Sequence, residues 1–211
     1  MAHLAQQRLS LCRLTEGRSN LPVARRAVLT GALGMLVARA GVAAAAHINL
    51  EYRNENLYWR GGETRAVAGV AGVRAAKKEG DGATPAGTFP LPFGMYRPDR
   101  IKLSHTDLPM TPLREAHAWV DDPGDPSYNR LVELPYPAHT EQMWRADGIY
   151  DLLVVVGANM NPTKPGAGSA IFLHIARPDF TPTEGCIAIG RSELLNLVTL
   201  LGPESTLTIQ E

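Results

Sequence analysis

The chain has 211 residues, 45% hydrophobic and 20% charged, a composition typical of a globular protein with a substantial core. Lys plus Arg and Asp plus Glu each total 21, so the formal net charge is zero. This balance, and the lack of basic runs interleaved with aromatic residues, argues against a protein that binds nucleic acid.

The first 46 residues differ in composition from the rest and have the parts of an export signal. Arg25 and Arg26 precede a run of small apolar residues that ends in alanines, of which those at 44–46 form a small-residue cleavage site. The paired arginines resemble a twin-arginine signal. An uncleaved membrane anchor is the alternative, but Arg39 interrupts the run, which is shorter than the roughly 20 apolar residues needed to cross a bilayer. We therefore expect cleavage before His47, no membrane span in the mature protein and a periplasmic location.

The mature chain, residues 47–211, is predicted to form a single mainly β domain. Apolar alternation on both sides of 54–56 predicts a β-hairpin near the start. Further strands are expected near 88–91, 150–157, 170–175, 186–189 and 207–209, with 150–157 in the centre of a sheet. One helix is expected over 192–201, with Ser192 as its amino-terminal cap.

Two stretches between these strands are rich in turn-forming or polar residues. Residues 77–98 contain several Gly and Pro, which predict a rigid loop, and Lys77 and Lys78 are expected on a solvated face. Residues 103–148 show little periodicity, and we expect irregular structure packed over the sheet as one wall of a cleft. The side chains proposed for that wall are Tyr128, Asn129, Trp144 and Arg145.

The segment HIARPDFTPTEGCIAI, residues 174–189, carries the strongest chemical pattern of the chain. His174 lies near the end of one predicted strand and Cys186 at the start of the next, with a proline-containing loop between them. A thiol attacks as thiolate, and an imidazole within reach can take its proton and later return it to a leaving amine. Gly185 allows close backbone approach, so that N–H groups of the turn could face a developing oxyanion.

Other roles are open to these two residues. Removal of the signal would leave Cys186 as the single cysteine, because Cys12 is the only other one, so an intramolecular disulfide is not expected. No metal site is expected, since the remaining histidines are scattered without ligand spacing. A small core cysteine and a structural histidine remain the alternatives to catalysis on spacing alone.

The segment from His174 through Thr183-Glu184-Gly185-Cys186 resembles the signature of the L,D-transpeptidase (YkuD-type) catalytic domain. A second element, GATPAGTF at 82–89, is similar to the Thr-Pro-x-Gly-x-Phe element of that family. The resemblance covers about residues 55–211. It implies a β-sandwich-like fold with irregular loops and a late α-helix, and a cysteine in a cleft. No cofactor is implied.

The resemblance also implies a reaction. Cys186 would be the nucleophile and His174 the general base and then acid, acting on peptidoglycan stem peptides through a thioester. Thr183, Glu184 and Gly185 would shape the oxyanion and substrate pocket. An amine on a neighbouring stem would resolve the thioester.

This chain departs from the family pattern in ways that indicate a divergent branch. Glu184 stands where the family usually has His, Ala188 where it has Arg, and Ile175 where a glycine commonly follows the histidine. The loop between base and nucleophile is also shorter. Arg177 is proposed to supply the missing cationic contact to a substrate carboxylate, because guanidinium binds carboxylates in a bidentate manner.

Two other functions stay open from the sequence. Water in place of the amine would make the protein an L,D-carboxypeptidase or an amidase that releases wall-linked peptides. Loss of the chemistry would leave a non-catalytic wall-binding module, in which the thiol would be inert.

Overall fold

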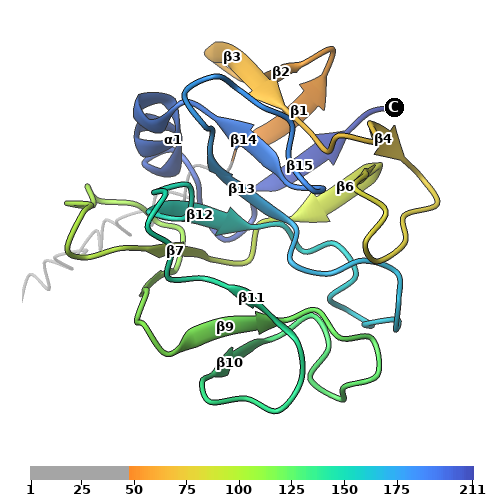
Figure 1. The fold of residues 1–211 in the computed structure, drawn as a ribbon. Coiled ribbons are helices and arrows are strands. Elements are labelled where there is room, and N and C mark those ends of the chain that lie inside the picture. The colour runs from red at the N-terminus through yellow and green to blue at the C-terminus, as the bar shows by residue number, and fades with distance from the viewer. Residues whose placement is uncertain (1–47) are drawn as a thin grey trace, which may run out of the picture. The chain divides into compact units, whose positions relative to one another are not determined.

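The structure, a computed structural model, describes residues 48–211 and shows a mainly β fold with one helix late in the chain (Figure 1). The expected export signal at 1–46 lies outside the described residues. No helix in the described part of the chain is long and apolar enough to cross a membrane.

The strands are β1 (Asn49–Arg53), β2 (Asn56–Trp59), β3 (Gly62–Val67), β4 (Val73–Arg74), β5 (Thr84–Pro85), β6 (Gly87–Pro90), β7 (Gly94–Tyr96), β8 (Met110–Pro112), β9 (His117–Val120), β10 (Leu131–Glu133), β11 (Thr140–Gln142), β12 (Leu152–Val155), β13 (Phe172–Ile175), β14 (Ile187–Ile189) and β15 (Thr206–Ile209). The helix α1 spans Arg191–Val198.

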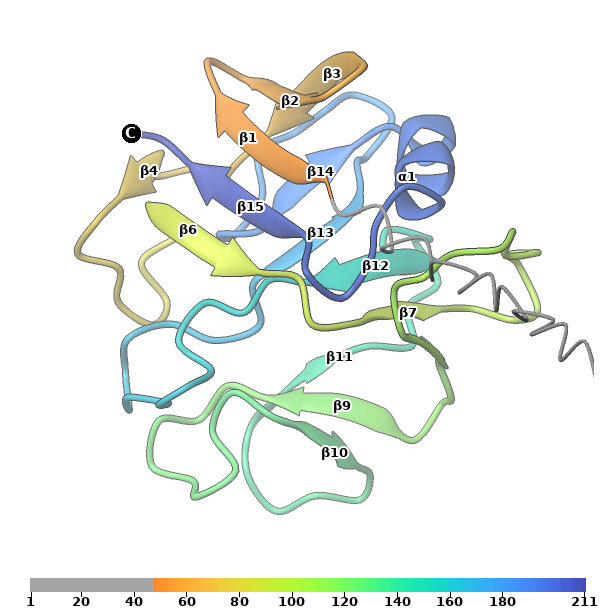
Figure 2. The ribbon, with the colours of Figure 1, turned by 180° about the vertical axis from the view of Figure 1, so that it is seen from behind.

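Ten of these strands form one sheet in the order β6-β15-β1-β2-β3-β14-β13-β12-β7-β8. Figure 2 shows β6, β15 and β1 side by side at one end of this order. One core cluster takes residues from both halves of the sheet, for example Leu57 and Leu207 from one half and Leu173 and Ile187 from the other. The sheet therefore curls so that its halves share one apolar core, which gives the sandwich-like arrangement that the family resemblance implied.

A second core lies on the opposite face of the β12–β13 half. There Leu153 and Phe172 of the large sheet pack with Trp119, which belongs to a separate three-stranded sheet in the order β10-β9-β11. The Trp119 and Phe172 rings meet edge to face, with centroids 5.2 Å apart. This small sheet comes from the stretch expected to be irregular, so that stretch is more regular than its weak periodicity indicated. Cys186 belongs to this second core.

The hairpin and the central strand are confirmed. β1 and β2 pair antiparallel around Asn54 and Glu55, both of which have positive φ, as a tight two-residue turn requires. β12 is paired on both sides, with β13 and β7. Its four residues are all buried, which explains the continuous apolar run.

The predicted helix exists, but its cap was assigned to the wrong residue. The helix begins at Arg191, its amino-terminal cap is Gly190, and no side chain caps it. Ser192 therefore lies inside the first turn, where its hydroxyl donates to Glu193. The helix buries Leu194, Leu197 and Val198 against the first core.

The parallel pair β13–β14 positions the His174–Cys186 segment. Leu173 pairs with Ile187 and His174 with Ala188, so Cys186 lies directly before β14 at the level of Phe172. Side chains alternate between faces along a strand. Leu173 and Ile187 therefore enter the first core, whereas His174 and Cys186 share the opposite face.

Candidate active site

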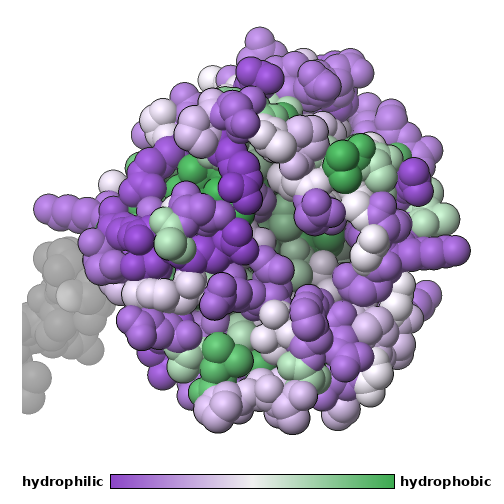
Figure 3. Space-filling model, in the orientation of Figure 1, coloured by the Kyte–Doolittle hydropathy of each residue, from purple (hydrophilic) through white to green (hydrophobic). Residues whose placement is uncertain are grey.

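A cavity of about 510 Å³ lies over the face of the sheet that carries His174 and Cys186. Its walls come from the loop after β4, from β11 and the chain that follows it, from the segment before β13, and from the loop between β13 and β14. Figure 3 shows hydrophilic side chains around a hollow near the centre of this face. The polar residues that line the cavity are Lys77, Glu79, Asp121, Glu141, Arg145, Tyr150, Ser169, His174, Arg177, Thr181, Thr183, Glu184 and Cys186.

Cys186 carries a free thiol that lines the cavity but is only 8% exposed. Its Sγ donates to the Ala170 carbonyl at 3.2 Å and accepts from the Phe172 N–H at 3.3 Å. Burial raises the pKa of the Cys186 thiol to about 12. The resting sulfur is therefore a protonated thiol fixed by two hydrogen bonds, and its ionisation requires a base.

His174 is 4% exposed and neutral at physiological pH. Burial lowers the pKa of the His174 imidazole to about 4. Its Nδ1 lies 2.9 Å from the Ile175 carbonyl oxygen, which can only accept, so Nδ1 carries the hydrogen. Nε2 is left with a free lone pair, the form that a general base needs. The Tyr150 ring meets the imidazole edge to face at 5.2 Å.

The two residues are diagonal neighbours on adjacent strands and line the same cavity. Within residues 48–211 they form no direct hydrogen bond, because the thiol hydrogen is directed to Ala170. Rotation of the Cys186 side chain about its Cα–Cβ bond would release this contact and turn the sulfur within the cavity. The arrangement brings an uncharged thiol and an uncharged base into one site.

The turn before Cys186 is built by Thr183 and Gly185. The Thr183 hydroxyl donates to the Cys186 carbonyl at 2.6 Å and accepts from the Gly185 N–H at 3.1 Å. The Gly185 N–H is thus engaged within the turn and does not face the cavity, unlike the oxyanion donor expected there. Gly185 has φ +137°, and a Cβ at this position would lie 2.8 Å from the Ala83 carbonyl oxygen. Only glycine fits this turn without strain.

The second sequence element supports this turn from beneath. Thr84 is fully buried, and its hydroxyl accepts from the Gly69 N–H at 2.8 Å and lies 3.4 Å from the Cys186 carbonyl, to which it donates. Glu184, next to the turn, lines the cavity. The two motifs that resemble the family are therefore in contact.

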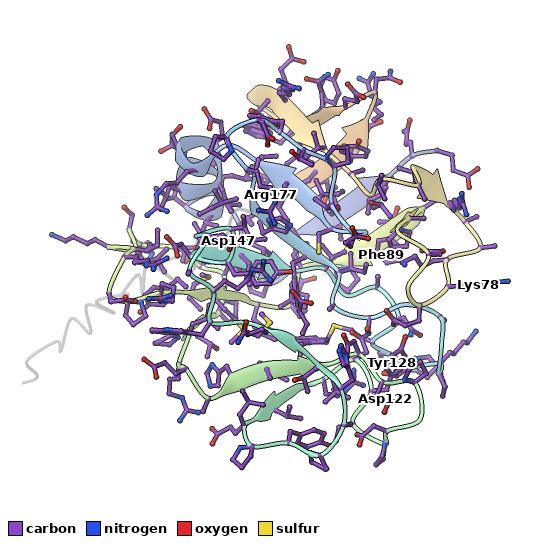
Figure 4. The ribbon with its side chains drawn as sticks, in the orientation of Figure 1. Lys78, Phe89, Asp122, Tyr128, Asp147 and Arg177 are labelled. Carbon is purple, nitrogen blue, oxygen red and sulfur yellow. The ribbon has the colours of Figure 1, made fainter. Side chains whose placement is uncertain are left out.

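Three charged residues meet at the cavity rim. Arg145 forms a bidentate pair with Asp147, with N–O distances of 3.0 and 2.7 Å. Arg177 reaches the same carboxylate over a longer 3.5 Å, and its side chain is 47% exposed. Figure 4 shows Arg177 and Asp147 near each other, with Tyr128 well away from them. Both arginines line the cavity, so guanidinium groups are present at its rim.

The other three residues proposed for the cleft wall do not line this cavity. Tyr128 is buried, and its hydroxyl accepts from the Gly168 N–H and donates to Glu79. Trp144 lies under the Arg97 guanidinium, 3.4 Å from the ring centroid. Both are held by neighbouring groups as structural side chains.

Asn129 is also buried, but it supports the site indirectly. Its amide oxygen accepts from the Ala170 N–H at 3.2 Å and from the Trp119 indole at 2.9 Å. Ala170 is the residue whose carbonyl accepts from the Cys186 thiol. Asn129 therefore fixes the segment that holds the resting sulfur.

Several cavity residues were not found by sequence reasoning. Lys77 was expected on a solvated face, but its side chain is 7% exposed and pairs with Asp81 at 2.6 Å. This ion pair, not solvation, compensates its charge. Glu141 and Tyr150 line the cavity from β11 and from the segment before β12, and no motif marks either of them. Glu141 lies in the polar stretch 103–148 that was expected to form a wall, whereas Tyr150 begins the run 150–157 that was expected to be a central strand.

No group of three or more His, Cys, Asp or Glu side chains within residues 48–211 is arranged to hold a metal ion. The polar groups of the cavity instead combine a thiol, an imidazole, and carboxylates and guanidinium groups. This set suits acyl transfer through a sulfur nucleophile.

The chain was compared with known proteins. A search of curated proteins gave no match. The family model of the L,D-transpeptidase catalytic domain matches residues 43–209, which is most of the chain and includes both motifs. The chain therefore belongs to the L,D-transpeptidase catalytic domain family.

Proposed function

We propose that the protein is an exported cysteine L,D-transpeptidase that acts on peptidoglycan stem peptides through a thioester on Cys186. Family membership supports the reaction class. The observation that carries the proposal is the neutral thiol and the neutral imidazole, with its free Nε2, on one face of one cavity. A purely structural thiol and histidine would not need to share a cavity lined by charged groups.

In this proposal the first half-reaction forms the thioester. The Cys186 sulfur attacks the carbonyl carbon that follows the third, L-chiral centre of a donor tetrapeptide, and Nε2 of His174 takes the thiol proton as the S–C bond forms. Because both groups are neutral at rest, proton removal accompanies the attack and no stored thiolate is required. The C–N bond then breaks, and the imidazolium returns its proton to the departing D-amino acid.

The developing oxyanion needs a donor. The Gly185 N–H is engaged by Thr183, which leaves the Cys186 N–H as the donor we assign to the oxyanion. Thr183 and Thr84 hold the Cys186 carbonyl, which belongs to the peptide group after the cysteine, and so restrain the backbone that follows the nucleophile. Their role in this proposal is to position the nucleophile.

In the second half-reaction an acceptor amine attacks the thioester carbonyl. His174 takes a proton from the amine and gives it to the departing sulfur, which restores the thiol. Attack by water on the same thioester would release a shortened stem. The nature of the acceptor therefore decides between transferase and carboxypeptidase or amidase.

The test uses purified disaccharide-tetrapeptide and mass analysis of the products. Cross-linked dimers with release of the terminal D-amino acid are expected, and both should disappear in Cys186→Ala and in His174→Ala. Shortened monomers alone would identify a hydrolase. If the correctly folded protein forms no product, the wall-binding module is favoured.

The periplasmic location is part of the same proposal and depends on residues 1–46. Fusion of these residues to a reporter that is active only after export should direct it out of the cytoplasm. Arg25→Lys with Arg26→Lys should block export if the twin-arginine route is used. Retention of the wild-type fusion in the cytoplasm would refute the location.

A further inference from the structure

The large sheet ends at β6, and no strand of the described chain pairs with its outer edge. Its inner edge pairs antiparallel with β15, where Thr88 lies opposite Thr208. Three positions further along, the Leu91 N–H donates to the Ser205 carbonyl at 3.0 Å. Opposite residues in such a pair alternate between hydrogen-bonded and non-hydrogen-bonded positions. Leu91 occupies a hydrogen-bonded position, so Thr88 occupies a non-hydrogen-bonded one, and its N–H and C=O point away from β15.

A contact of Pro90 supports this direction. Pro90 is two residues from Thr88 and so faces the same edge, and its carbonyl accepts from the Gly157 N–H at 2.8 Å. A Cβ at Gly157 would lie 2.7 Å from Cγ of Pro90, so the chain that leaves β12 closes against the end of β6. Within residues 48–211, Thr88 forms no backbone hydrogen bond outside the sheet. It therefore presents a donor and an acceptor that no strand receives.

A cavity of about 500 Å³, called the edge groove, lies along this outer edge. Residues 88–90 line one side and residues 157–162 the other, and Figure 1 and Figure 2 both show the loop between β12 and β13 beside β6. Asn159 fixes this loop, because its side-chain amide donates to the Lys164 and Gly168 carbonyls at 2.9 and 2.8 Å. The strand at the other end of the sheet, β8, lines neither the edge groove nor the active-site cavity. The unpaired backbone groups of β6 therefore face a preformed groove.

The charges of the edge groove indicate which peptide fits it. Two lysines line the groove, and no aspartate or glutamate of the described residues does. Lys77 is already paired with Asp81 at 2.6 Å, whereas Lys164 is exposed and can meet the charge of a ligand. The active-site cavity, in contrast, has several carboxylates in its lining. The edge groove therefore favours an extended peptide that carries a carboxylate.

The edge groove adjoins the candidate active site. Lys77 and Ile171 line both cavities. The Ile171 side chain also lies close to the nucleophile turn, 3.5 Å from the position that a Cβ of Gly185 would take. The wall that the two cavities share thus borders the turn that carries Cys186. An acceptor must lie beside the thioester, and the edge groove meets this requirement.

We propose that the edge groove binds the acceptor stem as an added strand along β6. One residue of the stem pairs with the N–H and C=O of Thr88, and a carboxylate of the stem pairs with Lys164. Main-chain hydrogen bonds of this kind hold extended peptides to exposed sheet edges. The donor stem occupies the cavity of His174 and Cys186, so each stem has its own cavity. This inference deepens the proposed function and rests on it for the identity of the peptide.

The test measures binding of a tripeptide stem to Cys186→Ala, in which no thioester can form. The tripeptide has no terminal D-residue to lose, so it acts only as an acceptor. Thr88→Pro removes the outward N–H, and an edge strand tolerates proline at such a position. Thr88→Ala removes the same side chain but keeps the N–H. The Kd from calorimetry should rise about tenfold in Thr88→Pro, because a carbonyl of the peptide loses its donor, and less than about twofold in Thr88→Ala.

A matched pair of lysines tests the charge. Lys164→Glu reverses a charge in the edge groove and should raise the Kd of the tripeptide about tenfold at low salt. Lys78→Glu makes the same change at an exposed lysine outside the lining of both cavities (Figure 4). This control should leave the Kd within about twofold of the parent value.

Amide hydrogen exchange in Cys186→Ala locates the bound peptide. The Thr88 N–H is unpaired at the free edge and becomes hydrogen-bonded when the peptide is added. Its exchange should slow about tenfold when about nine-tenths of the protein is bound, because exchange then proceeds through the free fraction. Amides of β8, at the opposite edge of the sheet, should exchange at unchanged rates.

Equal Kd values for Thr88→Pro and Thr88→Ala, a Thr88 amide whose exchange the peptide does not slow, or no binding at all would each overturn the proposal. If Thr88→Pro does not fold, the exchange of the Thr88 amide and the two lysine variants decide. None of these measurements needs catalysis. Binding in the edge groove by a protein that transfers nothing would refute the proposed function and leave a peptide-binding site. Cross-linking by a protein that binds no peptide in the groove would overturn this inference alone.

Discussion

Thr84 and Cys186 are separated by 102 positions in the sequence, yet the Thr84 hydroxyl donates to the Cys186 carbonyl oxygen over 3.4 Å. The same hydroxyl accepts from the Gly69 N–H at 2.8 Å. Thr84 thereby connects the loop after β3, the strand β5 and the turn that presents the thiol. The Thr-Pro element is thus a support of the nucleophile turn, although it contributes no side chain to the reaction.

Substitution of Thr84 by Val tests this support. Val has nearly the same shape but no hydroxyl, so the buried Gly69 N–H would lose its partner, at a cost of about 1–3 kcal/mol in the free energy of unfolding. Thr88→Val is the matched control, because Thr88 is exposed and its hydroxyl forms a hydrogen bond with the exposed hydroxyl of Thr208. Denaturant unfolding measures both. Equal stability of the two variants would show that the buried hydroxyl is not needed.

Gly185→Ala tests the geometry of the turn itself. Positive φ costs a non-glycine residue about 1–2 kcal/mol, and the added Cβ would also lie 2.8 Å from the Ala83 carbonyl oxygen. We expect a loss of stability larger than the backbone cost alone and a fall in kcat, since Cys186 follows directly. Gly166→Ala is the control for a positive-φ glycine without a steric clash, because Gly166 has φ +75° with open space around it. Similar losses in the two variants would remove the steric argument.

The sequence predicted the parts of the fold that follow from periodicity. The continuous apolar run at 150–157 predicted β12. The positions of His174 and Cys186 at strand ends predicted the neighbouring strands β13 and β14. The three-stranded sheet was not predicted, because β9, β10 and β11 are only three or four residues long, and β9 pairs with β11 as well as with its sequence neighbour β10. Short strands carry too few alternations to establish a period.

The site was predictable only where a motif marks it. Thr183 and Arg177 line the cavity, and the Gly185 N–H donates to the Thr183 hydroxyl within the turn. Glu141 and Tyr150 come together through packing of two sheets, which no local spacing encodes. The prediction that Lys77 lies on a solvated face was wrong, because a loop buries its charge together with that of Asp81.

Stability at low pH should depend on His174. The imidazole binds its proton near pH 6.5 when unfolded and near pH 4 when folded, so the unfolded state holds more protons between these values. Stability therefore rises with pH through this window, and the contribution is complete above 6.5 and lost as the pH falls toward 4. The difference of about 2.5 units corresponds to roughly 3 kcal/mol.

This pH dependence is measured by denaturant unfolding from pH 4 to 8 in the native protein and in His174→Asn. The variant lacks the titrating group, so its curve should be flatter by about the same amount. His117 also has a pKa lowered by burial, and it is unchanged in both proteins. Parallel curves would mean that His174 is not buried in its neutral form.

Alkylation of Cys186 should keep rising with pH well beyond the usual thiol range. Burial raises the thiol pKa to about 12, so the thiolate fraction increases about tenfold for each pH unit between 7 and 10. A carbapenem, which acylates the sulfur by the proposed route, should in contrast react at neutral pH, and His174→Ala should abolish that reaction. If the alkylation rate reaches a plateau near pH 8.5, Cys186 is an ordinary exposed thiol. If the thiol reacts with neither the alkylating reagent nor the carbapenem, the wall-binding module is favoured.

Arg177 should bind the carboxylate of the donor stem. Asp147 already accepts two hydrogen bonds from Arg145, at 3.0 and 2.7 Å, so its contact with Arg177 at 3.5 Å leaves most of the Arg177 guanidinium free for a ligand. Hydrogen bonds to charged groups contribute about 1.5–3 kcal/mol, and Arg177→Ala should raise KM about ten- to a hundredfold with little change in kcat. Arg177→Lys should recover part of the affinity, because charge is kept while the bidentate fork is lost. The control is Arg130→Ala, which removes an exposed guanidinium outside the cavity. If Arg177→Ala and this control have the same KM, Arg177 does not bind the substrate.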